Sequence, residues 1–153
     1  MHTWIIAAAG LAVLAAALTA NDMLRGQWQQ DTSFHIDSLD GKAPPADLAS
    51  EKSTSDRSCY DASETRSIAD FLRAGVERQC AGLDISASNG SLSVSGSCRY
   101  GGTTINATGS GSYSGTDFEL TIHGTGEVNG HRVTLTGRDS GHWLGTCAGE
   151  GNG

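Results

Sequence analysis

Aromatic side chains are scarce in this sequence: they fill only 6% of its 153 positions. A chain with so few bulky residues has little material for a thick core, so composition alone would favour disorder. Positive charge is scarce too, with 10 Lys and Arg against 17 Asp and Glu and a formal net charge of −7. This balance argues against nucleic acid or an anionic membrane surface as a partner.

Motifs that would indicate a particular chemistry are also missing. There is no GxxxxGK[ST] phosphate-binding loop and no GxSxG nucleophile elbow. No CxxC pair occurs, and the four cysteines have long, irregular spacings, which disfavours zinc. We therefore expect no cofactor, no metal and no catalytic residues, and a protein that is not an enzyme.

The N-terminal apolar run is too short to span a membrane. Residues 1–20 contain no charged side chain, and the run from Trp4 to Leu18 falls short of the about twenty residues that a spanning helix needs. Small residues follow it and then a polar chain, which is typical of a secretory signal peptide. Cleavage after Ala17 or after Ala20 remains open, as does an uncleaved N-terminal anchor.

This pattern divides the chain and gives it a compartment. We expect no stable membrane insertion after cleavage, and a periplasmic or secreted location. The expected parts are a signal peptide at 1–20, a single β-rich domain at 21–147 and a flexible tail at 148–153.

From Ser91 onward, apolar or glycine residues alternate with Ser, Thr and charged residues, which is typical of half-buried strands. Asn89-Gly90 and Asn129-Gly130 suit two-residue hairpin turns, Gly101-Gly102 can do the same, and 114–117 suits a four-residue loop. These turns predict cross-strand pairs in which large residues face glycine. The pairs are Gly126–Val133, Gly124–Leu135, Ile122–Gly137, Tyr113–Phe118, Gly111–Leu120, Gly109–Ile122, Cys98–Ile105 and Val94–Gly109, with Thr125–Thr134 and Glu127–Arg132 on the outer face.

The N-terminal half adds a strand over Gln27–Ile36, a long loop over 37–57, and a helix from Ser63 to about Ala74, closed by Gly75. Strands over Ala81–Ala87 and Ser91–Tyr100 follow.

The predicted fold is α+β and mostly β: a curved antiparallel meander sheet of about six strands, with one short helix packed on a glycine-lined concave face. Strong sheet curvature or close approach of the helix would explain the glycines. The helix would pack through Ile68, Phe71 and Leu72.

An even number of cysteines in an exported chain predicts two disulfides among Cys59, Cys80, Cys98 and Cys147. With a two-residue turn at Asn89-Gly90, Cys80 faces away from Cys98, so we favour the pairs Cys59–Cys80 and Cys98–Cys147. A three-residue turn with a bulge would allow Cys80–Cys98 instead.

Candidate site residues have plain structural interpretations. Opposite strand parity of His123 and His131 argues against a shared metal, and His35 and His142 add no ligand pattern. Asp117, Glu119, Glu127 and Asp139 could supply a carboxylate pair, and Asp139 has inward parity. Trp28 and Trp143 fit core or rim positions.

The segments "RGQWQQDTSF", "CAGLDISASNGSLSVSGSC", "GTTINATGSGSYSGTDFELTI" and "VTLTGRDSGHWLGTC", with Cys59 before a short helix, cover most of residues 25–147. This layout resembles the small exported bacterial proteins grouped as domain of unknown function 3617. The resemblance implies a location and a fold, and it carries no catalytic residues to this chain.

These observations favour a non-enzymatic binding or structural module of the cell envelope. Its site would be the concave sheet face, and its ligand a small apolar molecule or a peptide segment. One alternative is a protein inhibitor of a cell-wall hydrolase such as lysozyme, with Tyr113 beside the "GSGSYSG" hairpin loop and an acidic charge that suits a basic enzyme. Another is a hydrolase with an unrecognised site.

Overall fold

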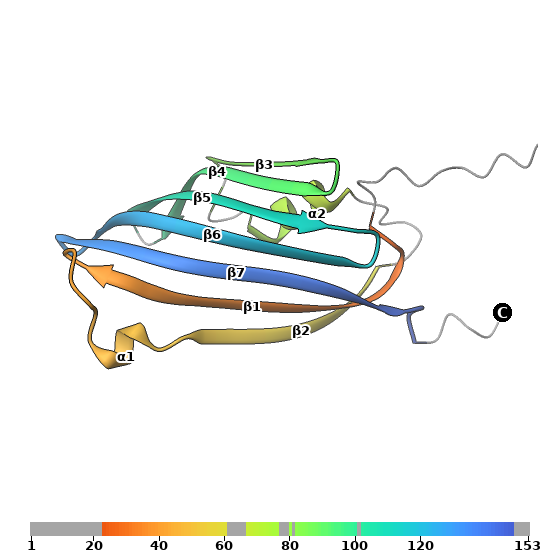
Figure 1. Ribbon diagram of the computed structural model, residues 1–153, viewed down its shortest axis with the longest axis horizontal. Helices are drawn as coiled ribbons and strands as arrows, with labels where there is room; N and C mark the ends of the chain where they lie inside the picture. The colour runs from red at the N-terminus through yellow and green to blue at the C-terminus, as the bar shows by residue number, and fades with distance from the viewer. Residues whose placement is uncertain (1–22, 61–66, 77–79, 81, 101, 149–153) are drawn as a thin grey trace, which may run out of the picture.

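The computed structural model describes residues 23–60, 67–76, 80, 82–100 and 102–148 (Figure 1). The expected signal peptide and most of the expected tail lie outside these residues. In chain order the elements are β1 (Gly26–Leu39), α1 (Ala46–Ala49), β2 (Lys52–Tyr60), α2 (Ile68–Val76), β3 (Gly82–Ser88), β4 (Ser91–Tyr100), β5 (Thr103–Tyr113), β6 (Asp117–Val128) and β7 (His131–Gly145).

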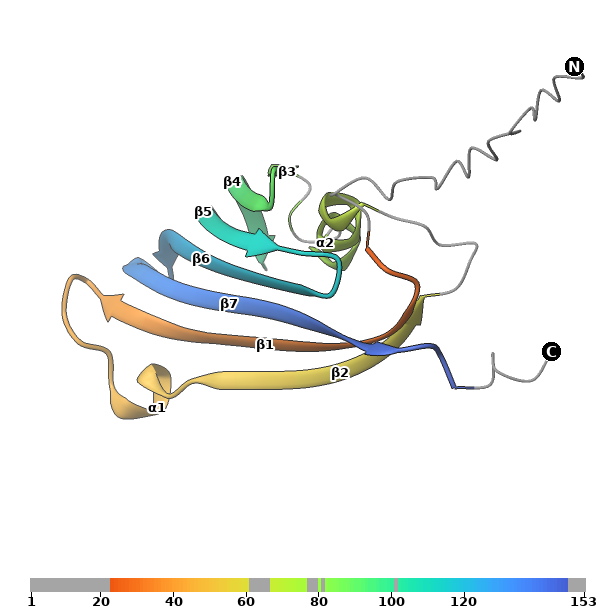
Figure 2. The ribbon, with the colours of Figure 1, turned by 45° about the vertical axis from the view of Figure 1, so that its right-hand side comes forward.

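The strands form one open antiparallel sheet in the order β2-β1-β7-β6-β5-β4-β3. Figures 1 and 2 show its curvature, with α2 lying against one face near one end. This architecture confirms the mostly-β fold class with a short helix and two disulfides. The described sheet has seven strands where about six were expected, because β2 was predicted as loop.

Turn chemistry sets the register of β3 to β7. Asn89 and Asn129 have φ of 49° and 51°, and the glycine after each has φ of 79°, as a two-residue turn of this type requires. All eight predicted inner-face pairs are confirmed, as are both outer-face pairs, Thr125–Thr134 and Glu127–Arg132.

The glycines of the inner face make room for neighbouring strands, not for the helix. A Cβ on Gly124 would lie 2.9 Å from Ile105 and 3.0 Å from Leu135, whose side chains lean over it from both sides. At Gly109 a Cβ would lie 2.7 Å from the carbonyl oxygen of Thr121 on the paired strand. Sheet curvature therefore explains these glycines, and the expected close approach of α2 does not.

The helix α2 covers one end of the inner face. Its Ile68 and Leu72 are buried in the main core, and Phe71 packs edge-on against Phe118 with ring centroids 5.8 Å apart. Ser63 itself lies outside the described residues, but α2 begins at Ile68 and Ser67 is not helical, so the expected unbroken helix from Ser63 is wrong. Ser67 Oγ accepts a hydrogen bond from the Asp70 amide, as an N-cap does. The helix continues through Gly75 to Val76, so the expected end at Gly75 is wrong.

The expected loop over 37–57 is wrong at both ends. β1 continues to Leu39, and β2 pairs with β1 from Gly26↔Tyr60 to Phe34↔Lys52. The side chains of β2 are exposed along both faces of the sheet as far as Cys59, so this strand carries no alternation of apolar and polar residues. Backbone pairing holds it in place, and the sequence pattern gave no sign of that pairing.

The disulfides join Cys59 to Cys147 and Cys80 to Cys98, with Cα atoms 5.6 and 3.9 Å apart, so the favoured pairing is wrong. The two-residue turn at Asn89-Gly90 is present, yet Cys80 reaches Cys98. The ladder stops at Gly82↔Ser97, and the chain turns there, with the Leu83 amide donating to the Cys80 carbonyl. Strand parity therefore does not extend to Cys80, and no register slip is needed.

The other bond fastens the ends of two strands that flank β1. Gln27 of β1 pairs with Cys59 on one side and with Gly145 on the other. The Cys59–Cys147 disulfide therefore connects β2 to the segment after β7 across the start of β1.

Candidate functional site

The inner face of the sheet divides into a covered half and an open half. The covered half lies under α2, where Leu92, Tyr113, Phe118 and Leu120 are buried with the helix. The open half lies toward the Asn129-Gly130 turn, because α2 contacts the opposite ends of the strands: its Phe71 packs against Tyr60 at the end of β2 and Phe118 at the start of β6. In Figure 2, α2 occupies only one end of the curve.

The open half carries an apolar strip on adjacent strands, which we define as Phe34 and Ile36 of β1, Leu135 of β7 and Ile122 of β6. Ile36 pairs with Leu135, and Gly137 lies between Phe34 and Ile122. Phe34 is 47% exposed, and the other three side chains are half-buried. Together the four side chains form a contiguous apolar patch, and it is such patches, rather than single exposed residues, that mark binding surfaces.

One carboxylate borders this strip. Asp139 pairs with Thr32 on β1 and Leu120 on β6, which places it between the strip and the core. Gln30 Nε2 donates to both of its oxygens, at 2.9 and 3.0 Å, and Thr32 Oγ1 donates at 3.3 Å. Burial raises the pKa of Asp139, and the hydrogen bonds from Gln30 and Thr32 oppose that rise.

Asp139 was expected on the inner face from its strand parity, and the structure places it there, held by hydrogen bonds from Gln30 and Thr32. Its partners Gln30 and Thr32 were missed as site residues, although both alternate with Trp28 and Phe34 in the first expected strand. Their contact with Asp139 depends on the pairing of β1 with β7, since Gln30 and Asp139 are 109 residues apart in the chain. No local pattern reports such a pairing.

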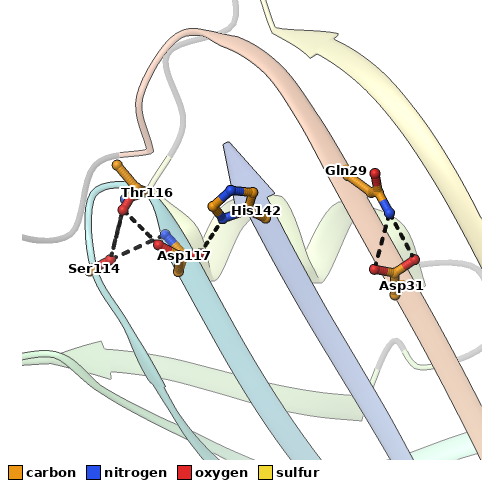
Figure 3. Close-up of polar contacts among 6 residues, drawn as sticks. All are labelled: Gln29, Asp31, Ser114, Thr116, Asp117 and His142. Atoms are coloured by element: carbon orange, nitrogen blue, oxygen red, sulfur yellow. Dashed lines mark hydrogen bonds and ion pairs between the residues drawn. The ribbon is translucent and has the colours of Figure 1, made fainter. Parts of the chain in front are cut away.

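Apart from the strip, a hollow of about 500 Å³ lies around the β5–β6 turn, and its lining includes Asp31, Asp117, Glu119, His142 and serine side chains. Figure 3 shows its polar contacts: the His142 Nδ1 atom contacts Asp117, and Ser114 Oγ accepts from the amides of Thr116 and Asp117. Hydrogen bonds from Thr116 and then His142 lower the pKa of Asp117. The hydrogen bonds of Ser114 and Thr116 hold the turn between β5 and β6.

The histidines each contact a different acidic or hydroxyl partner. His35 Nε2 lies 2.8 Å from Asp37, His131 Nδ1 lies 2.7 Å from Asp40, and His123 Nδ1 lies 3.2 Å from the Thr136 hydroxyl. Within the described part of the chain, no three His, Cys, Asp or Glu side chains cluster as a metal site would.

The other candidate residues are kept apart. Glu119 lines the hollow at the β5–β6 turn and Glu127 lies opposite Arg132, while Asp139 lies on the inner face, so none of the other three acids pairs with Asp139. Trp28 is buried, and Trp143 Nε1 donates to the Arg25 carbonyl at 3.0 Å. Tyr113 is 8% exposed, so the "GSGSYSG" loop does not present it to a partner.

These features define a class: a small disulfide-bonded open β-sheet protein with a helix on half of one face. Among the described residues, no helix is long and apolar enough to cross a bilayer. The chain belongs to the family described as protein of unknown function DUF3617, whose model matches residues 23–147. No curated protein and no solved structure matches it.

Proposed function

We propose that this protein is an exported binding protein of the cell envelope, without enzymatic activity, and that the apolar strip on its inner face binds a small apolar ligand. The half-exposed strip carries the proposal, above all the 47% exposure of Phe34. Two disulfides support an oxidising compartment, because such bonds persist outside the cytosol.

The border of the strip indicates which ligands suit it. Asp139 accepts hydrogen bonds from Gln30 and Thr32, and the protein is acidic overall. An anionic head group beside this carboxylate would be repelled at neutral pH. The geometry therefore favours a neutral or cationic apolar molecule, with a peptide segment as the alternative occupant.

The test is a fluorescence titration of the mature, oxidised protein with N-phenyl-1-naphthylamine, a neutral apolar probe. We expect saturable binding that Phe34→Glu weakens about tenfold or more, because burying a Phe side chain is worth about 1.5–3 kcal/mol. Leu144→Glu is the matched control, since Leu144 is 42% exposed on β7 outside the strip. Absent binding, or equal loss in both variants, would refute the proposal.

Inhibition of a cell-wall hydrolase such as lysozyme is the second candidate. The observation that favours it is the acidic lining of the hollow around Asp31, Asp117 and Glu119, which suits a basic enzyme. A lysozyme assay with the wild type and with Glu119→Lys tests it. Inhibition that the variant loses supports this function, and no inhibition by the wild type rejects it.

A further inference from the structure

The strand β2 ends the sheet, and only one of its sides is paired in the described part of the chain. Its partner is β1, and residues 51–59 are all exposed. The outer side of such a strand presents N–H and C=O groups that can pair with another strand. Figure 1 shows β2 running along the border of the sheet.

The charges of β2 are self-complementary. In an antiparallel pair of two copies centred on Thr54, Lys52 lies opposite Asp56 of the second copy, and Glu51, which directly precedes β2, comes opposite Arg57. A two-fold axis repeats each contact, so four opposite-charge pairs form along seven residues. Ser53 lies opposite Ser55, and Thr54 meets its own copy; hydroxyl pairs of this kind are favourable across strands.

Other registers lack this match. A two-fold axis between antiparallel strands runs perpendicular to the sheet, so residues directly opposite each other must have the same parity. Moving the centre to Ser53 or Ser55 leaves no opposite-charge pair within β2, and centring on Asp56 or Arg57 places like charges together. Thr54 is thus the one centre among these at which the charges attract.

The charges involved are available for this pairing. Among the described residues, the ion pairs include none from Lys52, Asp56 or Arg57, and Glu51 makes only a 3.8 Å contact with His35. The Cys59–Cys147 disulfide anchors the end of β2 beyond the paired stretch, which keeps the strand aligned with β1. Charged side chains on an edge strand usually disfavour pairing with another strand. On β2 the opposite charges would instead favour one register of pairing with a second copy.

We propose that β2 is a homodimerisation strand: two copies join edge to edge about Thr54 into one continuous sheet. The perpendicular axis places both inner faces on the same side of that sheet. The dimer contact is independent of the proposed ligand site, because it uses β2 and not the apolar strip.

Sedimentation velocity of the mature, oxidised protein over a range of concentrations tests the dimer. We expect reversible dimerisation that Lys52→Glu or Asp56→Lys each weakens about tenfold, since each change places two like-charge pairs in the interface. An equimolar mixture of the two variants should dimerise again, because Lys52→Glu in one copy then faces Asp56→Lys in the other. Asp84→Lys, on the opposite border strand β3, is the control and should dimerise as the wild type does.

The outcomes separate cleanly. A wild type that stays monomeric at the highest soluble concentration overturns the proposal. A dimer that ignores both variants, or a mixture that does not recover, shows that another surface or register forms the contact. Far-ultraviolet circular dichroism of each variant confirms that it has folded, and recovery in the mixture is a readout that a folding defect cannot imitate.

Discussion

Removing the Cys59–Cys147 disulfide should destabilise the protein more than removing Cys80–Cys98. The first bond joins residues 88 positions apart, and the second joins residues 18 apart. In the chain-entropy treatment, loops of these lengths correspond to about 4.6 and about 3.2 kcal/mol of stabilisation through the unfolded state. The expected difference is therefore about 1.4 kcal/mol.

The assay is urea unfolding of two double variants, Cys59→Ser with Cys147→Ser and Cys80→Ser with Cys98→Ser, compared with the oxidised wild type. Each variant keeps one native bond, so free-thiol titration should find none in either. A Cys59→Ser, Cys80→Ser variant is the control: it leaves Cys98 and Cys147 without their partners, and we expect two free thiols.

Peptide mapping of the unreduced wild type completes this test. Fragments linking Cys59 to Cys147 and Cys80 to Cys98 are expected. Recovery of a Cys59–Cys80 fragment, or full oxidation of the control variant, would refute the pairing and with it the position of β2 in the sheet. Equal destabilisation by the two double variants would show that loop length does not govern their contribution.

Two further predictions concern β7. Gly141→Ala should lower the free energy of unfolding by about 1–3 kcal/mol through overpacking, because its Cβ would lie 2.7 Å from two ring carbons of the buried Phe118. Gly137→Ala is the control, because its Cβ would meet nothing closer than 3.8 Å. Equal losses of the two variants in urea unfolding would contradict this prediction. Asp139→Asn should raise thermal stability at pH 7. Burial raises the pKa of Asp139 in the folded protein above its unfolded value, so the wild-type protein loses stability as the pH rises through the folded-state pKa and the buried carboxyl ionises. The gain should shrink as the pH falls toward the ordinary value of 3.8, and a gain that persists at lower pH would refute the assignment.

The hairpins from β3 to β7 were predictable because turn residues and alternation agree there. Asn129-Gly130 fixes one pairing, and a shift by a single residue would expose Val133 and Leu135. β2 was not predictable, since its side chains are polar on both faces and only its backbone and the Cys59–Cys147 bond place it.

The candidate site was predictable only in part. Parity placed Asp139 and Phe34 on inward-facing positions of separate strands. The contact of Asp139 with Gln30 depends on the β1–β7 pairing, which closes a long loop and leaves no local signal in the sequence. The extent of the open half depends on where α2 packs, and composition does not report that.

A ¹H–¹⁵N NMR titration of the mature, oxidised protein with N-phenyl-1-naphthylamine tests directly whether the apolar strip binds an apolar ligand. We expect chemical-shift changes concentrated at Phe34, Ile36, Ile122, Leu135 and Asp139, with the amides of β3 unchanged. Changes centred on Asp117 and His142, or no changes at saturating probe, would contradict it.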